Sequence, residues 1–208
     1  MCGTCGCGSE NKGPAILKPG EEKHEHSHGE HIHEHSHEGH HHHHEGHSHT
    51  HDHSHDHNHK VLAIEQDILK NNQVLAARNS GYFEAKNIFA LNLVSSPGSG
   101  KTSILERTLA DLKAEIPFYV IEGDQQTMND ANRIDALDIP VVQINTGKGC
   151  HLESDMVYNA VKKLEIQNDS ILMIENVGNL VCPSMFDLGE SKRIVIIKIL
   201  NFPIFLTC

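Results

Sequence analysis

The stretch Asn92–Leu105, NLVSSPGSGKTSIL, decides the fold. It runs from an apolar strand candidate, IFALNLV, through a turn rich in Gly and Ser into SILERTLADLKAE, which has helical spacing. The turn matches the pattern G-x-x-x-x-G-K-[ST] through Gly100, Lys101 and Thr102. Ser95 stands where the pattern has its first glycine. A strand before the turn and a helix after it are the context of a phosphate-binding loop, so the stretch predicts one.

Each part of this loop has an expected role. Backbone N–H groups of the turn would point at phosphate oxygens, and the helix N-terminus adds positive potential. The Lys101 amine would reach the β- and γ-phosphates, and the Thr102 hydroxyl would bind Mg²⁺. The alternative is an ordinary Gly-Ser turn, which the flanking strand and helix disfavour. The residues expected to bind nucleotide are Pro97, Gly98, Ser99, Gly100, Lys101, Thr102 and Ser103, with Gly178 from a later loop.

Strand and helix patterns alternate along the domain. Further strand candidates are 118–123, 141–144, 170–175 and 193–200, and helix candidates are 130–137 and 153–164. This alternation predicts an α/β fold of the P-loop NTPase type, with a mostly parallel sheet and helices on both faces. The residues from Val61 to about Lys86 predict a helix leading into the domain. Its expected apolar face consists of Ile64, Ile68, Leu69 and Leu75.

Carboxylates stand at the ends of two strand candidates. Glu122 and Asp124 end the second strand, and Glu175 ends the fourth. Ligands of open α/β sheets bind at such strand ends, although single carboxylates there are often merely solvated. Gly178 completes an acid-x-x-Gly pattern that suits a loop sensing the γ-phosphate. The residues expected to act in catalysis are Lys101, Asp124 and Glu175, and those expected to bind Mg²⁺ are Thr102, Asp124 and Glu175.

Composition excludes several classes of protein. The net charge of -11 and the absence of Trp argue against nucleic-acid binding through a basic, base-stacking surface. Neither a signal peptide nor an apolar stretch long enough to span a membrane is evident. We therefore expect a cytoplasmic protein without a membrane partner. Because thiols stay reduced in that compartment, clustered cysteines indicate metal or redox chemistry before disulfides.

Two N-terminal segments precede the domain. Residues 1–8 form a tip with Cys2, Cys5 and Cys7, whose thiolates suit Zn²⁺, Cu⁺, Ni²⁺ or an iron–sulfur cluster. Residues 9–60 hold 19 of the 20 histidines, and their low apolar content predicts a disordered segment. That histidine run suggests storage or buffering of divalent ions. Residues 61–208 are then the nucleotide-binding domain.

A third set of metal-ligand types lies inside the domain. Cys150 and His151 are adjacent in GKGCHLES, and Cys182 follows in NLVCPSM. An adjacent Cys and His cannot easily bind one tetrahedral ion alone, but they could do so together with Cys182 or with a second subunit. Taken singly, each cysteine is more often a buried small hydrophobe. Cys182, however, lies four residues beyond Gly178, so a metal ligand there would couple metal affinity to the nucleotide state.

Together these motifs resemble HypB, the hydrogenase nickel-incorporation GTPase family of the SIMIBI class of P-loop proteins. The matching stretches are CGTCGC, the histidine run, LVSSPGSGKT, EGDQQT, QINTGKGCHL and IENVGNLVCPSMFDLGE. The resemblance implies GTP hydrolysis, a GTP-dependent homodimer, and nickel delivery to the large subunit of [NiFe] hydrogenase with accessory maturation proteins. It implies a nickel site at Cys2, Cys5 and Cys7. It also implies a zinc or nickel site at Cys150, His151 and Cys182.

The last residues depart from this resemblance. Family members continue beyond RIVII into further strands and an Asn-Lys-x-Asp motif that reads guanine. Here the sequence reads KILNFPIFLTC, without that motif. We therefore expect a domain truncated after about residue 193, with a sheet incomplete at its C-terminal end. A nickel-carrying GTPase is the first hypothesis, and a nickel storage protein with a non-functional nucleotide domain is the second. A urease-type nickel GTPase fits the cysteine motifs less well.

Overall fold

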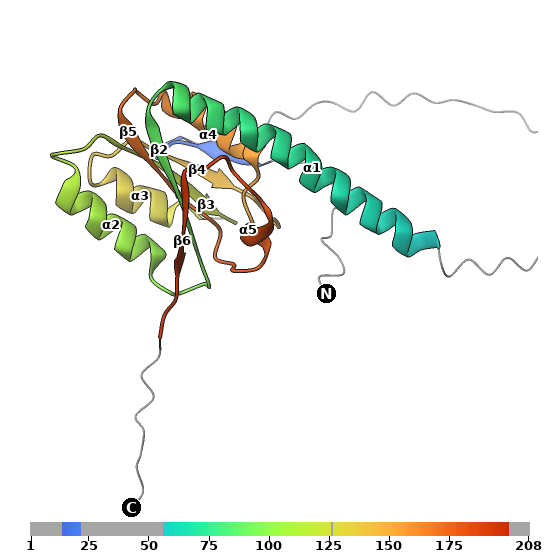
Figure 1. The fold of residues 1–208 in the computed structure, drawn as a ribbon. Coiled ribbons are helices and arrows are strands. Elements are labelled where there is room, and N and C mark those ends of the chain that lie inside the picture. The colour runs from blue at the N-terminus through green and yellow to red at the C-terminus, as the bar shows by residue number, and fades with distance from the viewer. Residues whose placement is uncertain (1–13, 22–55, 126, 200–208) are drawn as a thin grey trace, which may run out of the picture.

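A six-stranded sheet forms the centre of the molecule (Figure 1). The computed structural model describes residues 14–21, 56–125 and 127–199. The strand order is β1-β4-β3-β5-β2-β6, and all neighbouring strands are parallel except β1, which is antiparallel to β4. The mostly parallel sheet is therefore confirmed. Its strands are β1 (Ala15–Leu17), β2 (Ile88–Ser95), β3 (Phe118–Asp124), β4 (Val141–Asn145), β5 (Ser170–Glu175) and β6 (Lys192–Ile196).

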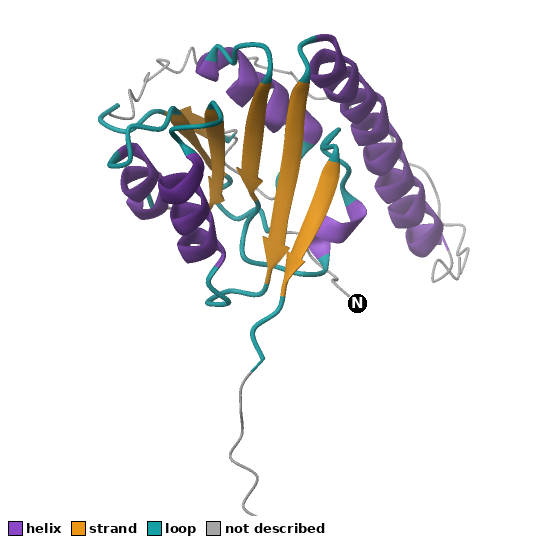
Figure 2. Ribbon diagram, turned by 60° about the vertical axis from the view of Figure 1, so that its left-hand side comes forward, coloured by secondary structure: helices purple, strands orange, loops and turns teal. Residues whose placement is uncertain are grey.

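Helices cover both faces of the sheet, as the strand and helix patterns predict. Figures 1 and 2 show α1 and α4 on one face, with α2 and α3 on the other. Side chains of β3 alternate between the two resulting cores: Ile121 packs toward α4, and Val120 packs toward α2. No helix in the described ranges is long and apolar enough to cross a membrane. The helices are α1 (Asp56–Ala85), α2 (Lys101–Leu112), α3 (Asn129–Asp135), α4 (Ser154–Leu164) and α5 (Cys182–Met185).

The parallel register brings three strand ends to one edge of the sheet. Glu175 at the end of β5 is the register partner of Leu93 in β2 and of Glu122 in β3. The loops that follow these three strands therefore start side by side, which is where ligands bind in sheets of this kind.

The first long helix is confirmed, but the residues that it buries are not those expected. Of the expected residues, Ile68 is 48% exposed, and Leu69 and Leu75 are half-buried. The fully buried residues are Asn72, Ala76, Asn79 and Phe83. Their spacing of four, three and four residues places them on one side of the helix. Two of the four are asparagines with hydrogen-bonded side chains, so a search for apolar spacing overlooks this face.

The folded part begins earlier than the sequence predicts. Ala15–Leu17, inside the segment expected to be disordered, pairs with β4 as β1. The Lys163 side chain of α4 donates a hydrogen bond of 2.9 Å to the Ile16 carbonyl oxygen. These three apolar residues therefore have both a strand partner and a helix that covers them. The histidine run, and Cys2, Cys5 and Cys7, lie outside the described residues, so predictions about them stay predictions.

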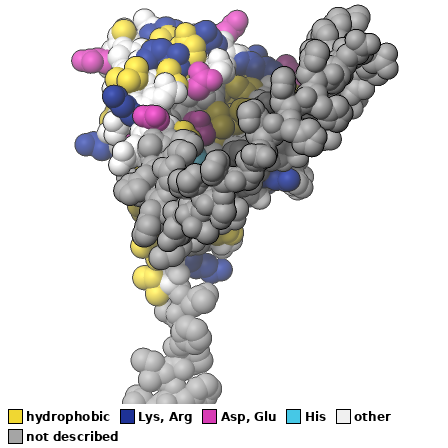
Figure 3. Space-filling model, turned by 90° about the vertical axis from the view of Figure 1, so that its right-hand side faces the viewer, with side chains coloured by type: hydrophobic (Ala, Val, Ile, Leu, Met, Phe, Trp, Pro, Cys, Tyr) yellow, Lys and Arg dark blue, Asp and Glu magenta, His cyan; other side chains and the backbone are white. Residues whose placement is uncertain are grey.

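The last strand ends within the stretch predicted as 193–200. It pairs in parallel with β2 and forms one edge of the sheet in the described part of the chain. Apolar surface appears next to the grey C-terminal residues in Figure 3. The exposed apolar side chains of this region are Ile194, Val195, Ile197 and Ile199.

Candidate functional site

The loop between β2 and α2 has the backbone of an anion cradle. Gly98 and Gly100 have φ angles of 69° and 93°, a left-handed conformation that favours glycine. Gly100 caps the N-terminus of α2, and its carbonyl oxygen accepts the first helical hydrogen bond, 3.0 Å from the Ile104 nitrogen. The first N–H groups of α2 have no partners within the helix, so they can donate to an anion.

A buried carboxylate lies against this loop. Glu175 Oε1 accepts a hydrogen bond of 2.8 Å from the Thr102 hydroxyl and lies 3.8 Å from Lys101 Nζ. Both charged side chains are buried, at 5% and 8% exposure. Burial raises the pKa of Glu175 to about 7, although Thr102 and Lys101 lower it. Its Oε2 atom has no hydrogen-bond partner in the described structure, so the site fits a bound cation.

A second buried carboxylate adjoins the first. Glu122 of β3 is 2% exposed, and its Oε1 atom has no hydrogen-bond partner among the described residues. Burial, and then the neighbouring Glu175, raise the pKa of Glu122 well above its usual value. Two carboxyl groups this close together favour the protonated state until a cation compensates them. The sequence pattern pointed to this strand end without assigning Glu122 a role.

Asp124 completes the acidic strand ends. Its carboxylate accepts hydrogen bonds from the backbone N–H groups of Gln125 and Thr127, at 2.7 and 3.0 Å, and from the Thr127 hydroxyl at 2.5 Å. These contacts fix the carboxylate on the turn that follows β3. Asp124 and Glu175 line the same pocket, so the two expected magnesium ligands share one site.

The pocket itself has a volume of about 620 Å³, within the usual range for small-molecule sites. All eight residues expected to bind nucleotide line it, from Pro97 to Ser103 and at Gly178. Arg133 of α3 also lines it and forms an ion pair with Asp130, N–O distance 3.2 Å, and another with Glu106. The sequence gives no motif around Arg133 that would have identified it.

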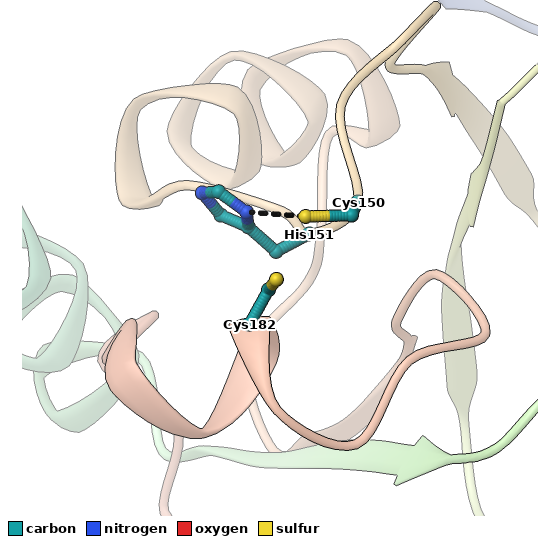
Figure 4. A group of neighbouring side chains, drawn as sticks. All are labelled: Cys150, His151 and Cys182. Atoms are coloured by element: carbon teal, nitrogen blue, oxygen red, sulfur yellow. Dashed lines mark hydrogen bonds between the residues drawn. The ribbon is translucent and has the colours of Figure 1, made fainter. Parts of the chain in front are cut away.

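The three candidate metal ligands of the domain converge next to this pocket. The ligand atoms of Cys150, His151 and Cys182 all lie within 4.8 Å of one another. Figure 4 shows Cys150 and His151 on one loop and Cys182 at the start of a short helix, with the side chains directed toward one another. Cys150 Sγ lies 3.6 Å from His151 Nδ1. The chain thus brings together ligands that the sequence separates.

The surroundings of His151 hold its ring in place. The ring stacks on Phe186, with centroids 3.8 Å apart. Its buried Nε2 atom has no hydrogen-bond partner in the described ranges and lies 3.7 Å from Glu153 Oε1. Two sulfur donors and one imidazole suit Zn²⁺ or Ni²⁺. Three protein ligands also leave a coordination position for exchange.

Residues 89–198, more than half of the chain, match the family described as CobW/HypB/UreG, nucleotide-binding domain. The chain belongs to this family.

Curated relatives of the chain include hydrogenase maturation factors named HypB. The factor from Rhizobium leguminosarum bv. viciae is 54% identical over 140 residues, covering 67% of this chain and 47% of the relative. The chain thus spans about half the length of the curated relatives it matches. The crystal structure of HypB from Helicobacter pylori in complex with nickel is 43% identical, with a TM-score of 0.57 over 60% of this chain and 59% of that one. HypB from Archaeoglobus fulgidus also has a TM-score of 0.57, at 38% identity and 62% coverage of both chains.

In this member of the family, one loop connects the pocket to the metal-ligand cluster. A Cβ atom on Gly178 would lie 3.2 Å from Pro97 Cα, so the two backbones are in close contact. The next residue, Asn179, forms a β-bridge with Ser95. The Asn179 side chain donates to Cys182 Sγ at 3.4 Å and accepts from the Cys182 backbone nitrogen at 3.3 Å. The loop therefore touches the phosphate loop and holds a cysteine.

A buried asparagine provides a second connection to the cluster. Asn176 follows Glu175 directly and is 1% exposed. Its Oδ1 atom accepts from the backbone nitrogen of Leu152, the residue after His151, at 3.2 Å. Its Nδ2 atom donates to Asn92 of β2 at 3.3 Å. Sequence reasoning missed both Asn176 and Asn179, although the stretch ENVGN places them on either side of the expected γ-phosphate loop.

Proposed function

We propose that this chain is a nickel-carrying GTPase that acts in the maturation of [NiFe] hydrogenase, with GTP hydrolysis coupled to metal release. One observation carries the proposal. Cys150 lines the nucleotide pocket and also belongs to the Cys150–His151–Cys182 cluster. A nucleotide and a metal ion would therefore occupy neighbouring sites with a common wall.

The hydrolytic part follows from the pocket. Lys101 and the N–H groups at the start of α2 would bind the β- and γ-phosphates. Glu175 contacts both Lys101 and Thr102, so the side chains of Glu175 and Thr102 would lie beside the same phosphates. A Mg²⁺ ion would be held by Thr102, Glu175 and Asp124, and it would neutralise part of the negative charge of the phosphates. Catalysis of phosphoryl transfer relies on such positioning and charge stabilisation, so no nucleophilic side chain is needed.

Coupling would pass through the Gly178–Asn179 loop. A γ-phosphate beside Gly178 would move or fix this loop, and Asn179 holds the Cys182 thiol. Asn176 offers a parallel route from Glu175 to the residue after His151. A change in either contact alters the arrangement of the three metal ligands, and therefore the affinity for the ion.

The proposal also includes the metal ion that is carried and the proteins with which the chain would act. The relatives' names support a role in hydrogenase maturation, and the nickel-bound HypB of Helicobacter pylori supports nickel as the ion. We propose initial capture at Cys2, Cys5 and Cys7, and a Zn²⁺ or Ni²⁺ site at the cluster. We further propose a GTP-dependent homodimer, transfer to the hydrogenase large subunit with accessory maturation proteins, and a cytoplasmic location.

The test measures nucleotide and metal binding in one preparation of the full chain. Radiolabelled GTP and ATP are compared in filter binding, and Ni²⁺ affinity is measured with GDP and with a non-hydrolysable GTP analogue. We expect GTP binding and a change of Ni²⁺ affinity between the two nucleotides. A folded chain that binds neither nucleotide would remove the enzymatic part of the proposal. Equal Ni²⁺ affinity in both nucleotide states would remove the coupling.

The histidine run favours a second candidate function, the storage or buffering of nickel. Nineteen histidines between His24 and His59 can bind several ions. Deletion of residues 24–59 separates the two functions. If storage is the function, the deletion removes most of the metal capacity and there is no GTP hydrolysis to preserve. For the GTPase, hydrolysis survives the same deletion.

A further inference from the structure

The long helix α1 holds two buried asparagines against loops from the far end of the chain. Asn72 and Asn79 are 4% and 2% exposed. They lie seven residues apart, which is close to two helical turns, so they project from the same side of α1. Neither belongs to the nucleotide pocket or to the set of metal ligands.

Both asparagines bridge the same two segments. Asn72 Oδ1 accepts from the Ser154 nitrogen at 2.9 Å, and its Nδ2 donates to the Asp187 carbonyl oxygen at 2.7 Å. Asn79 Nδ2 donates to the Ser154 carbonyl oxygen at 2.8 Å and to the Leu188 carbonyl oxygen at 3.0 Å. The Ser154 hydroxyl adds a direct bond of 2.6 Å to the Asp187 carbonyl oxygen. Five hydrogen bonds thus join α1, the start of α4 and the segment after α5.

The helix α1 also packs so closely against the segment after α5 that there is no room for a side chain at Gly189. Gly189 has a φ of 83°, and a Cβ atom there would lie 2.4 Å from the Ala76 carbonyl oxygen and 2.8 Å from Asn79 Cβ. The backbone of the segment after α5 therefore rests directly on α1. Its position is fixed by contact as well as by hydrogen bonds.

The two bridged segments are those that carry the metal ligands. Ser154 lies three residues after His151, and Asp187 lies five residues after Cys182. We propose that Asn72 and Asn79 are positioning residues for the Cys150–His151–Cys182 cluster: α1 clamps the two ligand-bearing segments at the spacing that one metal ion requires. This inference rests on the metal site of the proposed function.

A clamp has a consequence that a merely structural contact does not have. If docking of α1 brings the ligands together, metal binding must stabilise the docking of α1 by the same factor, because the two equilibria are linked. The clamp therefore predicts slower amide hydrogen exchange in α1 when metal binds at the cluster. A contact that only stabilises the fold would leave metal affinity and this exchange response unchanged.

Cobalt(II) is the probe, because thiolate ligands give it a charge-transfer band that histidine ligands do not give. The full chain carries Cys2→Ser, Cys5→Ser, Cys7→Ser and Cys208→Ser, so that the band reports on Cys150 and Cys182 alone. In this parent chain, Asn72→Ala and Asn79→Ala are tested singly. The matched control is Asn71→Ala, an exposed asparagine on the same helix.

We expect each clamp substitution to raise the Kd for Co²⁺ about tenfold, the scale at which outer-shell partners affect metal sites, and to shift the ligand-field bands. Asn71→Ala should change neither, and GTP affinity should stay the same in all variants. Ser154→Ala is the milder variant, since it removes one hydroxyl and leaves both asparagines, and it should raise the Kd about threefold. In the parent chain, Co²⁺ should slow exchange in residues 66–85.

Three outcomes would overturn the inference. Unchanged Co²⁺ affinity in the folded Asn72→Ala, Asn79→Ala and Ser154→Ala chains would show that α1 does not position the ligands. If bound Co²⁺ does not change the rate of amide hydrogen exchange in α1, the linkage between metal binding and docking of α1 is contradicted. A parent chain without the charge-transfer band would remove the metal site and the clamp together, while GTP binding by the same sample would leave the nucleotide part of the proposed function standing.

Discussion

The nucleotide pocket and the metal-ligand cluster share a wall, yet they are held in place in different ways. The longest continuous part of the pocket wall is the stretch Pro97–Ser103, and the rest comes from α3 and from segments at the ends of the parallel strands β3, β4 and β5. The cluster is built from two loops, and the buried side chains of Asn72, Asn79 and Asn176 hydrogen-bond to the backbone of the segments that follow its ligands. With the clamp proposed above, the cluster also depends on Asn72 and Asn79, which belong neither to the pocket nor to the set of metal ligands.

The largest expected effect separates the two sites directly. Lys101→Ala removes the amine expected to bind phosphate, so it should weaken GTP binding by roughly 3 kcal/mol, more than a hundredfold in Kd. Co²⁺ binding at Cys150 and Cys182 without nucleotide should be unchanged. Nucleotide and Co²⁺ titrations measure both quantities, with the exposed Lys113→Ala as control. Loss of Co²⁺ binding in the Lys101 variant would mean that the pocket and the cluster fold as one unit.

A second effect concerns the pocket alone and depends on pH. The pKa of Glu175 is raised to about 7, so between pH 4.5 and 7 the folded chain keeps a proton that the unfolded chain has lost. Stability without ligand should therefore fall as pH rises through this window, and Glu175 should account for roughly 3 kcal/mol of the fall. Glu122 adds a dependence of the same sign.

Urea unfolding from pH 5 to pH 8 measures this dependence. Glu175→Gln should flatten the profile and make the chain more stable than the parent at pH 8, whereas the exposed Glu115→Gln should leave the profile unchanged. An equally steep profile in Glu175→Gln would assign the dependence to other groups. Saturating Mg²⁺ and GTP should also flatten the parent's profile, because a bound cation favours the ionised carboxylate.

These two predictions concern residues that sequence patterns identify, and the reason is physical. The phosphate loop, Asp124 and Glu175 are specified by neighbours in the chain: a strand, a turn with glycines, and a helix. The asparagines of α1 are different, because Asn72 and Asn79 bond to segments more than 70 residues away. Because they are polar, a search for a buried helix face by the spacing of apolar residues does not find them. A single sequence does not show which distant carbonyl an amide will meet.

The strand β1 was missed for a similar reason. Three apolar residues surrounded by polar ones carry little local preference, and their partner strand β4 follows more than 120 residues later. The family resemblance and the nearness of Gly178 predict that Cys182 meets Cys150 and His151, whereas spacing alone leaves open whether Cys182 or a second subunit completes the site.

A third, smaller effect sharpens the link between the two sites. Asn176→Ala leaves the Leu152 nitrogen and the Asn92 side chain without this buried partner, so it should cost about 2 kcal/mol of stability. It should also reduce the difference in Co²⁺ affinity between the GDP and GTP states. Chemical denaturation and Co²⁺ titration measure the two effects, with the exposed Asn159→Ala as control. An undiminished nucleotide effect would assign the coupling to Asn179 alone.

The smallest expected effect lies at the contact between the loops. Gly178→Ala adds a methyl group 3.2 Å from Pro97 Cα, a distance that the backbone can relieve by a small shift. We expect about threefold weaker binding of a GTP analogue and little change for GDP, because only the γ-phosphate side of the pocket is displaced. Equilibrium binding of the two nucleotides measures the ratio. Equal losses for both would show that Gly178 does not discriminate between them.

The antiparallel strand β1 has a consequence for intramolecular transfer. Ala15 pairs with Asn145, so the chain enters the sheet beside the end of β4, five residues before Cys150. Cys7 precedes Ala15 by eight residues, a length that extends at most about 28 Å. The chain length therefore limits Cys7 to within about 28 Å of Ala15, which pairs with the end of the strand that leads to Cys150. If metal passes from the proposed N-terminal site to the cluster, the transfer would take place within one molecule. Its effective concentration would then be set by the length of the connecting chain and would not depend on the concentration of the protein.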